Sequence, residues 1–124
     1  MVETTAQEWR RVMSVNVDGA FFMTQACVPH MEENKWGRIV NMSSWAWKSG
    51  GLTAGTAYST SKAAITGLTF STARQYAGVG ITANGIAPCY VMSKMVSEQL
   101  SVRLKNVIST SVVCLHLTDF LCKN

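Results

Sequence analysis

The chain has 124 residues, of which 48% are hydrophobic and 15% charged, so its composition predicts a folded domain and excludes a disordered chain. Its 11 basic and 7 acidic residues give a net charge of +4, and no three consecutive residues are Lys or Arg. We therefore expect neither a nucleic-acid partner nor binding to an anionic membrane. No stretch approaches the ~20 apolar residues that a membrane-spanning helix needs.

The N-terminus and the cysteines favour a reducing compartment. Residues Met1–Thr5 are polar and acidic, which is unlike a signal peptide. The four cysteines form no Cys-x-x-Cys pair, and neither histidine stands at metal-ligand spacing from one of them. We expect free thiols, no metal site and an intracellular, cytoplasmic protein, with an organelle left open.

A long helix is expected to begin at Thr5, because Thr5-Ala6-Gln7-Glu8 has the form of a capping box. Apolar residues then recur at helical spacing as far as Met31. Such a helix of about 25 residues would be ~38 Å long. Pro29 lacks an N–H donor and is expected to end or kink it.

Two strands and a second long helix follow. Arg38–Ser43 is almost continuously apolar, which is typical of a parallel strand covered on both faces. A glycine-rich loop at 49–56 leads to a helix at Thr56–Ala77, ended by nearby glycines. Ile81–Ala87 is the second expected strand, and Met92–Leu104 a short helix.

This order of elements indicates an α/β fold. Helix–strand–helix–strand–helix is the C-terminal part of a doubly wound, Rossmann-like parallel sheet, which is incomplete here. From about Val102 the sequence is apolar without a clean period. We therefore divide the chain into a partial domain at 1–101 and a divergent apolar tail at 102–124.

Tyr58 and Lys62 form a candidate acid–base site. They stand four residues apart, so a helix places them on one face, one turn apart. A positive charge beside a phenol favours the phenolate, and such a tyrosine can exchange a proton with an alcohol or carbonyl oxygen. Ser44, fourteen residues before Tyr58 at the end of the first strand, could hold the same oxygen.

Four blocks of sequence extend this pattern. They are VNVDG at 15–19, GRIVNMSS at 37–44, AYSTSKA at 57–63 and ITANGIAP at 81–88. In this order they resemble the short-chain dehydrogenase/reductase family, most closely its 3-oxoacyl-[acyl-carrier-protein] reductase-like members, over about residues 3–100. The resemblance implies an NAD(P)(H)-dependent oxidoreductase that interconverts a carbonyl and a secondary alcohol of a small-molecule substrate by hydride transfer.

The resemblance also implies roles for individual residues. Tyr58 is the general acid/base, Lys62 supports it and hydrogen-bonds the nicotinamide ribose, and Ser44 positions the substrate oxygen. Asn16 matches the helix asparagine that holds a water in the proton relay to Lys62. The alternative for Asn16 is an asparagine that caps a local kink near Gly19.

Two further points concern which residues reach the site. Side chains alternate along a strand, so only one of Ser43 and Ser44 can point into it, and the spacing to Tyr58 favours Ser44. Trp45 and Trp47 flank the site loop and are either pocket walls or core or interface aromatics.

The cofactor contacts after the second strand are implied only in part. Pro88, Val91 and Ser93 match the positions around the nicotinamide carboxamide and the phosphate. Cys89 replaces the family's glycine, which would strain the backbone if that position needs a positive φ.

The family's glycine-rich phosphate-binding turn and its Asn-Asn-Ala-Gly segment are not in this sequence, and Gly51–Gly55 is the nearest mimic. We therefore expect this chain alone to bind NAD or NADP weakly or not at all. In the family, the helices that match Thr5–Met31 and Thr56–Ala77 pack against a neighbouring subunit, which implies a homo-oligomer. The alternatives are an inactive truncated subunit that joins a full-length paralogue, or an incomplete gene model.

Overall fold

The computed structural model describes residues 1–51 and 54–90, and the backbone of 112–115. The expected helix at 92–104 lies outside these residues. The elements are α1 (Ala6–Met13), the π-helical turn η1 (Ser14–Asp18), α2 (Gly19–Glu33), β1 (Gly37–Met42), α3 (Ala46–Ser49), α4 (Gly55–Tyr76), the 3₁₀ turn η2 (Ala77–Val79), β2 (Ile81–Pro88) and β3 (Val112–Leu115). The predicted alternation of helices and strands is confirmed.

The first helix begins where the capping box places it, because the Thr5 Oγ1 accepts the N–H of Glu8 at 3.1 Å. The helical course then runs on to Glu33, so of the two expected effects of Pro29, ending the helix is wrong, and a kink stays a prediction. A proline removes one helical hydrogen bond. Gln25, whose carbonyl loses that partner, is exposed, and water can replace the missing donor.

The two predicted strands form the parallel pair that the fold class requires. β1 pairs with β2 in register from Gly37 opposite Ile81 to Met42 opposite Ile86. The tail, for which we predicted no element, supplies β3, which pairs antiparallel with the last residues of β2. The strand order is therefore β1-β2-β3, with β1 at one edge of the described sheet.

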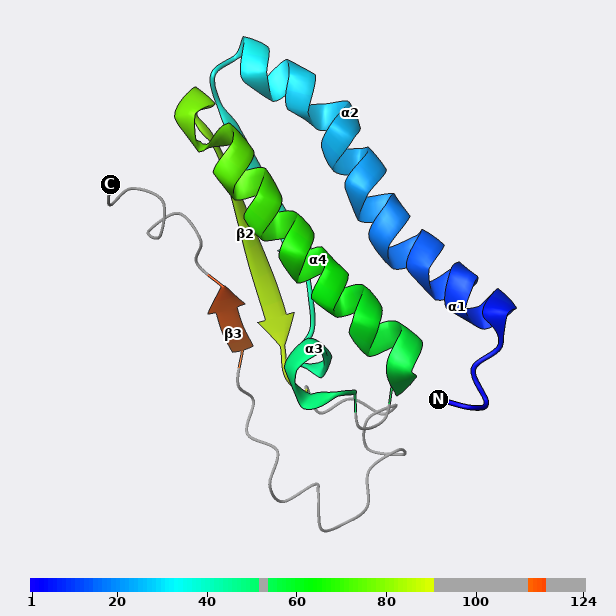
Figure 1. Cartoon of the computed structure of the whole chain (residues 1–124). Helices are drawn as coiled ribbons and strands as arrows, with labels where there is room; N and C mark the ends of the chain where they lie inside the picture. Colours follow the sequence, from blue (N-terminus) through cyan, green and yellow to red (C-terminus); the bar gives the residue numbers. More distant parts are fainter. Residues whose placement is uncertain (52–53, 91–111, 116–124) are drawn as a thin grey trace.

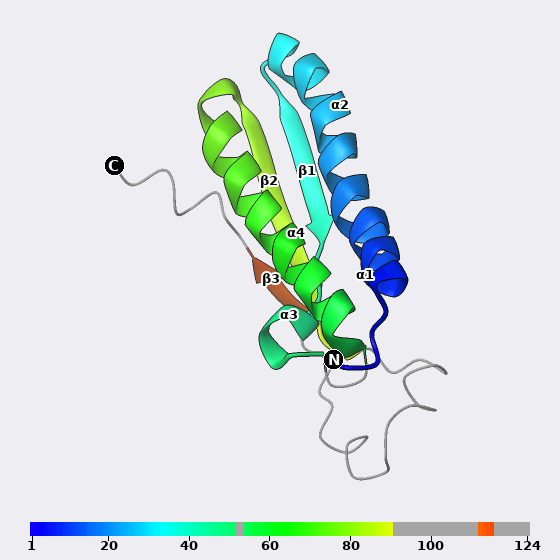
Figure 2. The ribbon, with the colours of Figure 1, turned by 45° about the vertical axis from the view of Figure 1, so that its right-hand side comes forward.

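The helices α1, α2 and α4 all lie over the same face of the sheet (Figures 1 and 2). Along β1, Ile39 and Asn41 are buried, whereas Val40 and Met42 are 58% and 52% exposed. The prediction of a strand covered on both faces is therefore wrong for this chain. Its apolar residues on the second face have no covering layer within the described residues.

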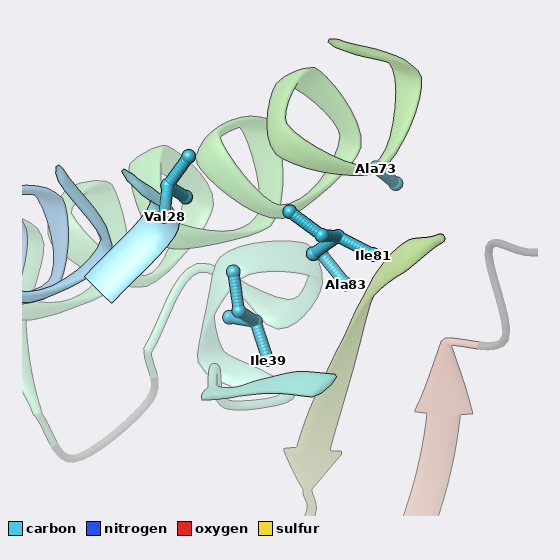
Figure 3. Packing of buried hydrophobic residues seen from close by; sticks show 5 residues of the cluster. All are labelled: Val28, Ile39, Ala73, Ile81 and Ala83. Atoms are coloured by element: carbon cyan, nitrogen blue, oxygen red, sulfur yellow. The ribbon is translucent and has the colours of Figure 1, made fainter. Parts of the chain in front are cut away.

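A small apolar core joins the helices to the sheet. Figure 3 shows Val28 from α2 and Ala73 from α4 facing Ile39, Ile81 and Ala83 from the strands. This cluster lies near the start of the strands, and the opposite end of the α4–sheet contact is polar. Among the described residues, no helix has both the length and the apolar character to cross a bilayer.

Candidate active site

The middle of α4 is held against β1 by buried side-chain hydrogen bonds. Asn41 donates through Nδ2 to the Thr69 Oγ1 at 2.9 Å. Two residues further along the chain, the Ser43 Oγ donates to the Lys62 carbonyl at 2.9 Å and lies 2.9 Å from the Thr66 Oγ1. Inside the protein such bonds are directional and costly to leave unmade, so they fix which turn of α4 faces the end of β1.

The two serines after β1 have different environments. Ser43 is buried and its hydroxyl is bonded to α4. Ser44 is half-buried, and its Oγ accepts the N–H of Ala46 at 3.2 Å, which leaves the hydroxyl proton available to a substrate. This arrangement supports the choice of Ser44 over Ser43, and the catalytic role of Ser44 stays a prediction.

Tyr58 and Lys62 lie one turn apart on α4, with the Lys62 Nζ 5.5 Å from the centroid of the Tyr58 ring. The ammonium also donates to the carbonyl of Met42, the last residue of β1, at 2.8 Å. Partial burial lowers the pKa of Lys62 below its ordinary value. Ser44 follows the end of β1 after one residue. Lys62, with Tyr58 beside it, and Ser44 therefore lie near the carboxyl end of β1.

Asn16 reaches the same part of α4 from the first helix. It lies in the π-helical turn η1, and its Nδ2 donates to the Ser61 Oγ at 2.9 Å. The backbone near Gly19 therefore does depart from a regular α-helix, as the kink alternative supposed. The Asn16 amide nevertheless bonds across to α4, one residue before Lys62.

The end of β2 is joined to the segment that carries Ser44. The Pro88 carbonyl accepts the N–H of Trp45 at 2.9 Å, which brings Pro88 next to Ser44. Cys89 does not take a positive φ, so the strain considered for a cysteine at this position is absent. Val91 and Ser93, the other expected cofactor contacts, lie outside the described residues.

The structure describes the surroundings of Trp45 and Trp47 and of two cysteines. Trp45 and Trp47 are half-buried around α3, and the Lys48 Nζ lies 5.1 Å from a Trp45 ring centroid. Cys27 is an exposed free thiol and Cys89 a partly buried one. Within the ranges that the structure covers, no group of three His, Cys, Asp or Glu side chains could hold a metal ion.

The donors present fit one end of a nicotinamide cofactor. The Tyr58 hydroxyl and the Lys62 ammonium supply O–H and N–H donors suited to ribose hydroxyls. The glycines before α4 are explained by the local turn and not by a ligand. Gly51 has a φ of 71°, and a Cβ there would crowd the Ser59 side chain and the Gly55 carbonyl. Within the described residues we find no glycine-rich turn arranged to bind a pyrophosphate.

Sequence reasoning missed three hydroxyls on the buried face of α4, those of Ser61, Thr66 and Thr69. Ser61 and Thr66 are five residues apart and Thr66 and Thr69 three, and a pattern search that counts only apolar residues does not see them. Thr66 and Thr69 bond to Ser43 and Asn41, and these two polar residues in an otherwise apolar strand segment are the sequence signal that could have found them.

Comparison with known proteins decides the family. A family model described as short chain dehydrogenase matches residues 1–103 of this chain. The chain belongs to the short-chain dehydrogenase/reductase family. This confirms the resemblance carried by the four sequence blocks.

Two curated relatives illustrate what this chain is similar to. A (2S)-[(R)-hydroxy(phenyl)methyl]succinyl-CoA dehydrogenase subunit of Thauera aromatica is 44% identical over 92 residues, 73% of this chain and 36% of the relative. The 3-oxoacyl-[acyl-carrier-protein] reductase of Aquifex aeolicus is 35% identical over 104 residues, 82% of this chain and 42% of the relative.

Solved structures show the same doubly wound fold. The 3-oxoacyl-[acyl-carrier protein] reductase of Brucella melitensis matches with a TM-score of 0.77 and 33% identity, over 86% of this chain and 40% of the reductase. A xylitol dehydrogenase solved with bound NAD⁺ matches with a TM-score of 0.72 and 34% identity, over 84% of this chain and 40% of that one. The chain thus spans about two fifths of the relatives that it matches.

The two serines give a direct test of the site geometry. Ser43→Ala should lower the free energy of unfolding by about 0.5–1.5 kcal/mol, because it removes a buried hydroxyl that hydrogen-bonds to α4. Ser44→Ala should change that free energy by less than about 0.5 kcal/mol. Urea denaturation of the two variants measures the difference. Equal losses would show that the two hydroxyls are not in different environments.

Proposed function

We propose that the protein is an NAD(P)(H)-dependent oxidoreductase that interconverts a carbonyl and a secondary alcohol, with Tyr58 as general acid/base. The observation that carries this proposal is that Tyr58 and Lys62 lie one turn apart on α4, with Lys62 bonded to the last carbonyl of β1, two residues before Ser44. The relatives named above, whose names are those of dehydrogenases and reductases, support the same reaction class.

The proton chemistry follows from the side chains. In reduction the Tyr58 hydroxyl gives its proton to the carbonyl oxygen, and in oxidation the phenolate takes the proton back. The nearby Lys62 ammonium stabilises the phenolate, and the Ser44 hydroxyl donates to the substrate oxygen as charge develops on it. A bound nicotinamide cofactor supplies the hydride in reduction and accepts it in oxidation.

The remaining site residues complete the proposal. Tyr58 and Lys62 would hold the nicotinamide ribose, and Pro88, Val91 and Ser93 would lie around the carboxamide and the phosphate. Asn16 would hold a relay water next to Lys62 through an acceptor oxygen, since its Nδ2 already bonds to Ser61. The cofactor is NAD or NADP, and the substrate is a small carbonyl compound or alcohol.

A second candidate function is association with another subunit. Three neighbouring apolar residues of α2 are well exposed: Phe21 (45%), Phe22 (59%) and Met23 (67%). Phe70 on α4 is also exposed. Exposed apolar surface of this kind marks an interface or an aggregation risk. The partner would be a second copy of this chain, or a full-length paralogue in a mixed oligomer in which this chain is catalytically inactive.

Cofactor binding by the 124-residue chain should be weak. The described residues provide donors for the ribose end and no helix N-terminus shaped for a pyrophosphate. Fluorescence titration with NADH and with NADPH measures this directly. Micromolar affinity for either cofactor would contradict the expectation.

Tyr58→Phe should abolish most turnover in a fusion that places the N-terminal half of a family member before residue 1. The change keeps the ring and deletes the proton donor, so kcat should fall by about 10² to 10⁴-fold or more. Tyr76→Phe, at the far end of α4, is the control and should keep normal turnover. Near-normal turnover in Tyr58→Phe would refute the assignment.

The isolated chain should sediment as self-associated species, and a full-length paralogue co-expressed with it should recruit it into a mixed oligomer. Phe22→Glu should weaken both kinds of association, because it places a charge in the apolar surface of α2. Val79→Glu, at an exposed apolar residue of η2, is the matched control. A compact monomer of 13.5 kDa that melts cooperatively would contradict the prediction.

A further inference from the structure

The hydroxyl of Ser61 links the first helix to the backbone of Tyr58. Ser61 is completely buried, with 0% of its surface exposed. Its Oγ donates to the Tyr58 carbonyl at 2.7 Å and accepts the Nδ2 of Asn16 at 2.9 Å. A serine has one hydroxyl proton, and here it goes to Tyr58. The Asn16 amide must therefore be the donor, which fixes the direction of both bonds.

The π-helical turn η1 makes this contact compatible with the rest of the first helix. The Gly19 N–H bonds to the Ser14 carbonyl, five residues back. One extra residue in a helical turn rotates the segment before it relative to the segment after it. Asn16 can thus face α4 while Val28, further along the same helical course, packs into the core over β1.

The first turn of α4, which leads to Tyr58, lacks a capping side chain. α4 begins at Gly55 after a glycine-rich loop, and its N-cap residue Ala54 makes no side-chain capping bond. A helix start without a capping side chain leaves backbone donors unsatisfied and tends to fray. The bonds through Ser61 hold this first part of α4 from the buried side.

We propose that Asn16 and Ser61 are a positioning pair that holds Tyr58 at the angle needed for proton transfer. This inference rests on the proposed function, since it concerns the same tyrosine. Ser61 contacts the backbone of Tyr58 and not the phenol, so it acts through Tyr58. Reactions of this kind are sensitive to small displacements, and a misplacement of about 1 Å can cost up to about 10²-fold in rate.

The kinetic test uses the fusion described above. Ser61→Ala should lower kcat by about 10- to 100-fold with little change in KM, because the phenol is misplaced and binding is not. In an Asn16→Ala background, the same change should cost less than about 2-fold, since the pair acts as a unit. Thr72→Ala is the matched control. It removes another buried hydroxyl of α4, which donates to the Leu68 carbonyl at 2.8 Å, and should leave kcat unchanged.

A second measurement does not depend on activity. In the 124-residue chain, Ser61→Ala should speed amide hydrogen exchange at residues 59–62 about tenfold, and Thr72→Ala should not. Unchanged exchange there, or a Ser61→Ala variant with the kcat of the Thr72→Ala control, would overturn the inference. Failure of the proposed function would instead appear as normal turnover in Tyr58→Phe.

Discussion

The buried hydrogen bonds between the β1 segment and α4 determine how Tyr58 and Lys62 lie relative to Ser44. Asn41 and Ser43 of the strand segment bond to Thr69 and to the Lys62 carbonyl of the helix. Apolar packing between a strand and a helix tolerates sliding, because it has no preferred direction. Paired donors and acceptors in a buried interface do not tolerate sliding, since a shift of one turn would leave several of them unsatisfied. The polar interface therefore fixes the register that the small apolar core leaves open.

The consequence of this register is chemical. It brings the Lys62 ammonium to the last carbonyl of β1 and keeps it near the Tyr58 ring. The same bonds occupy the hydroxyl of Ser43, whereas the Ser44 hydroxyl accepts the N–H of Ala46, which supports the proposal that Ser44 holds the substrate oxygen. Structure and proposed chemistry thus depend on one set of contacts, to which the Asn16–Ser61 pair adds a link from the first helix.

The sequence predicts the regular elements well, and long-range contacts explain what it missed. α4 was expected at 56–77 and lies at 55–76, and β2 was expected at 81–87 and lies at 81–88, because capping, glycines and apolar period are local signals. The π-helical turn, β3 and the one-sided burial of β1 depend on which segments meet in space. The roles of Tyr58, Lys62 and Ser44 came from motif order, and Ser61 became visible only through its contacts.

A double-mutant cycle between Asn41 and Thr69 tests the polar interface most directly. Asn41→Val, Thr69→Val and the double variant are compared by urea denaturation, with the free energy of unfolding as the readout. If the buried bond fixes the register, each single change leaves an unsatisfied partner, and the coupling energy should be about 1 kcal/mol or more. Additive effects, with coupling below about 0.3 kcal/mol, would contradict the account.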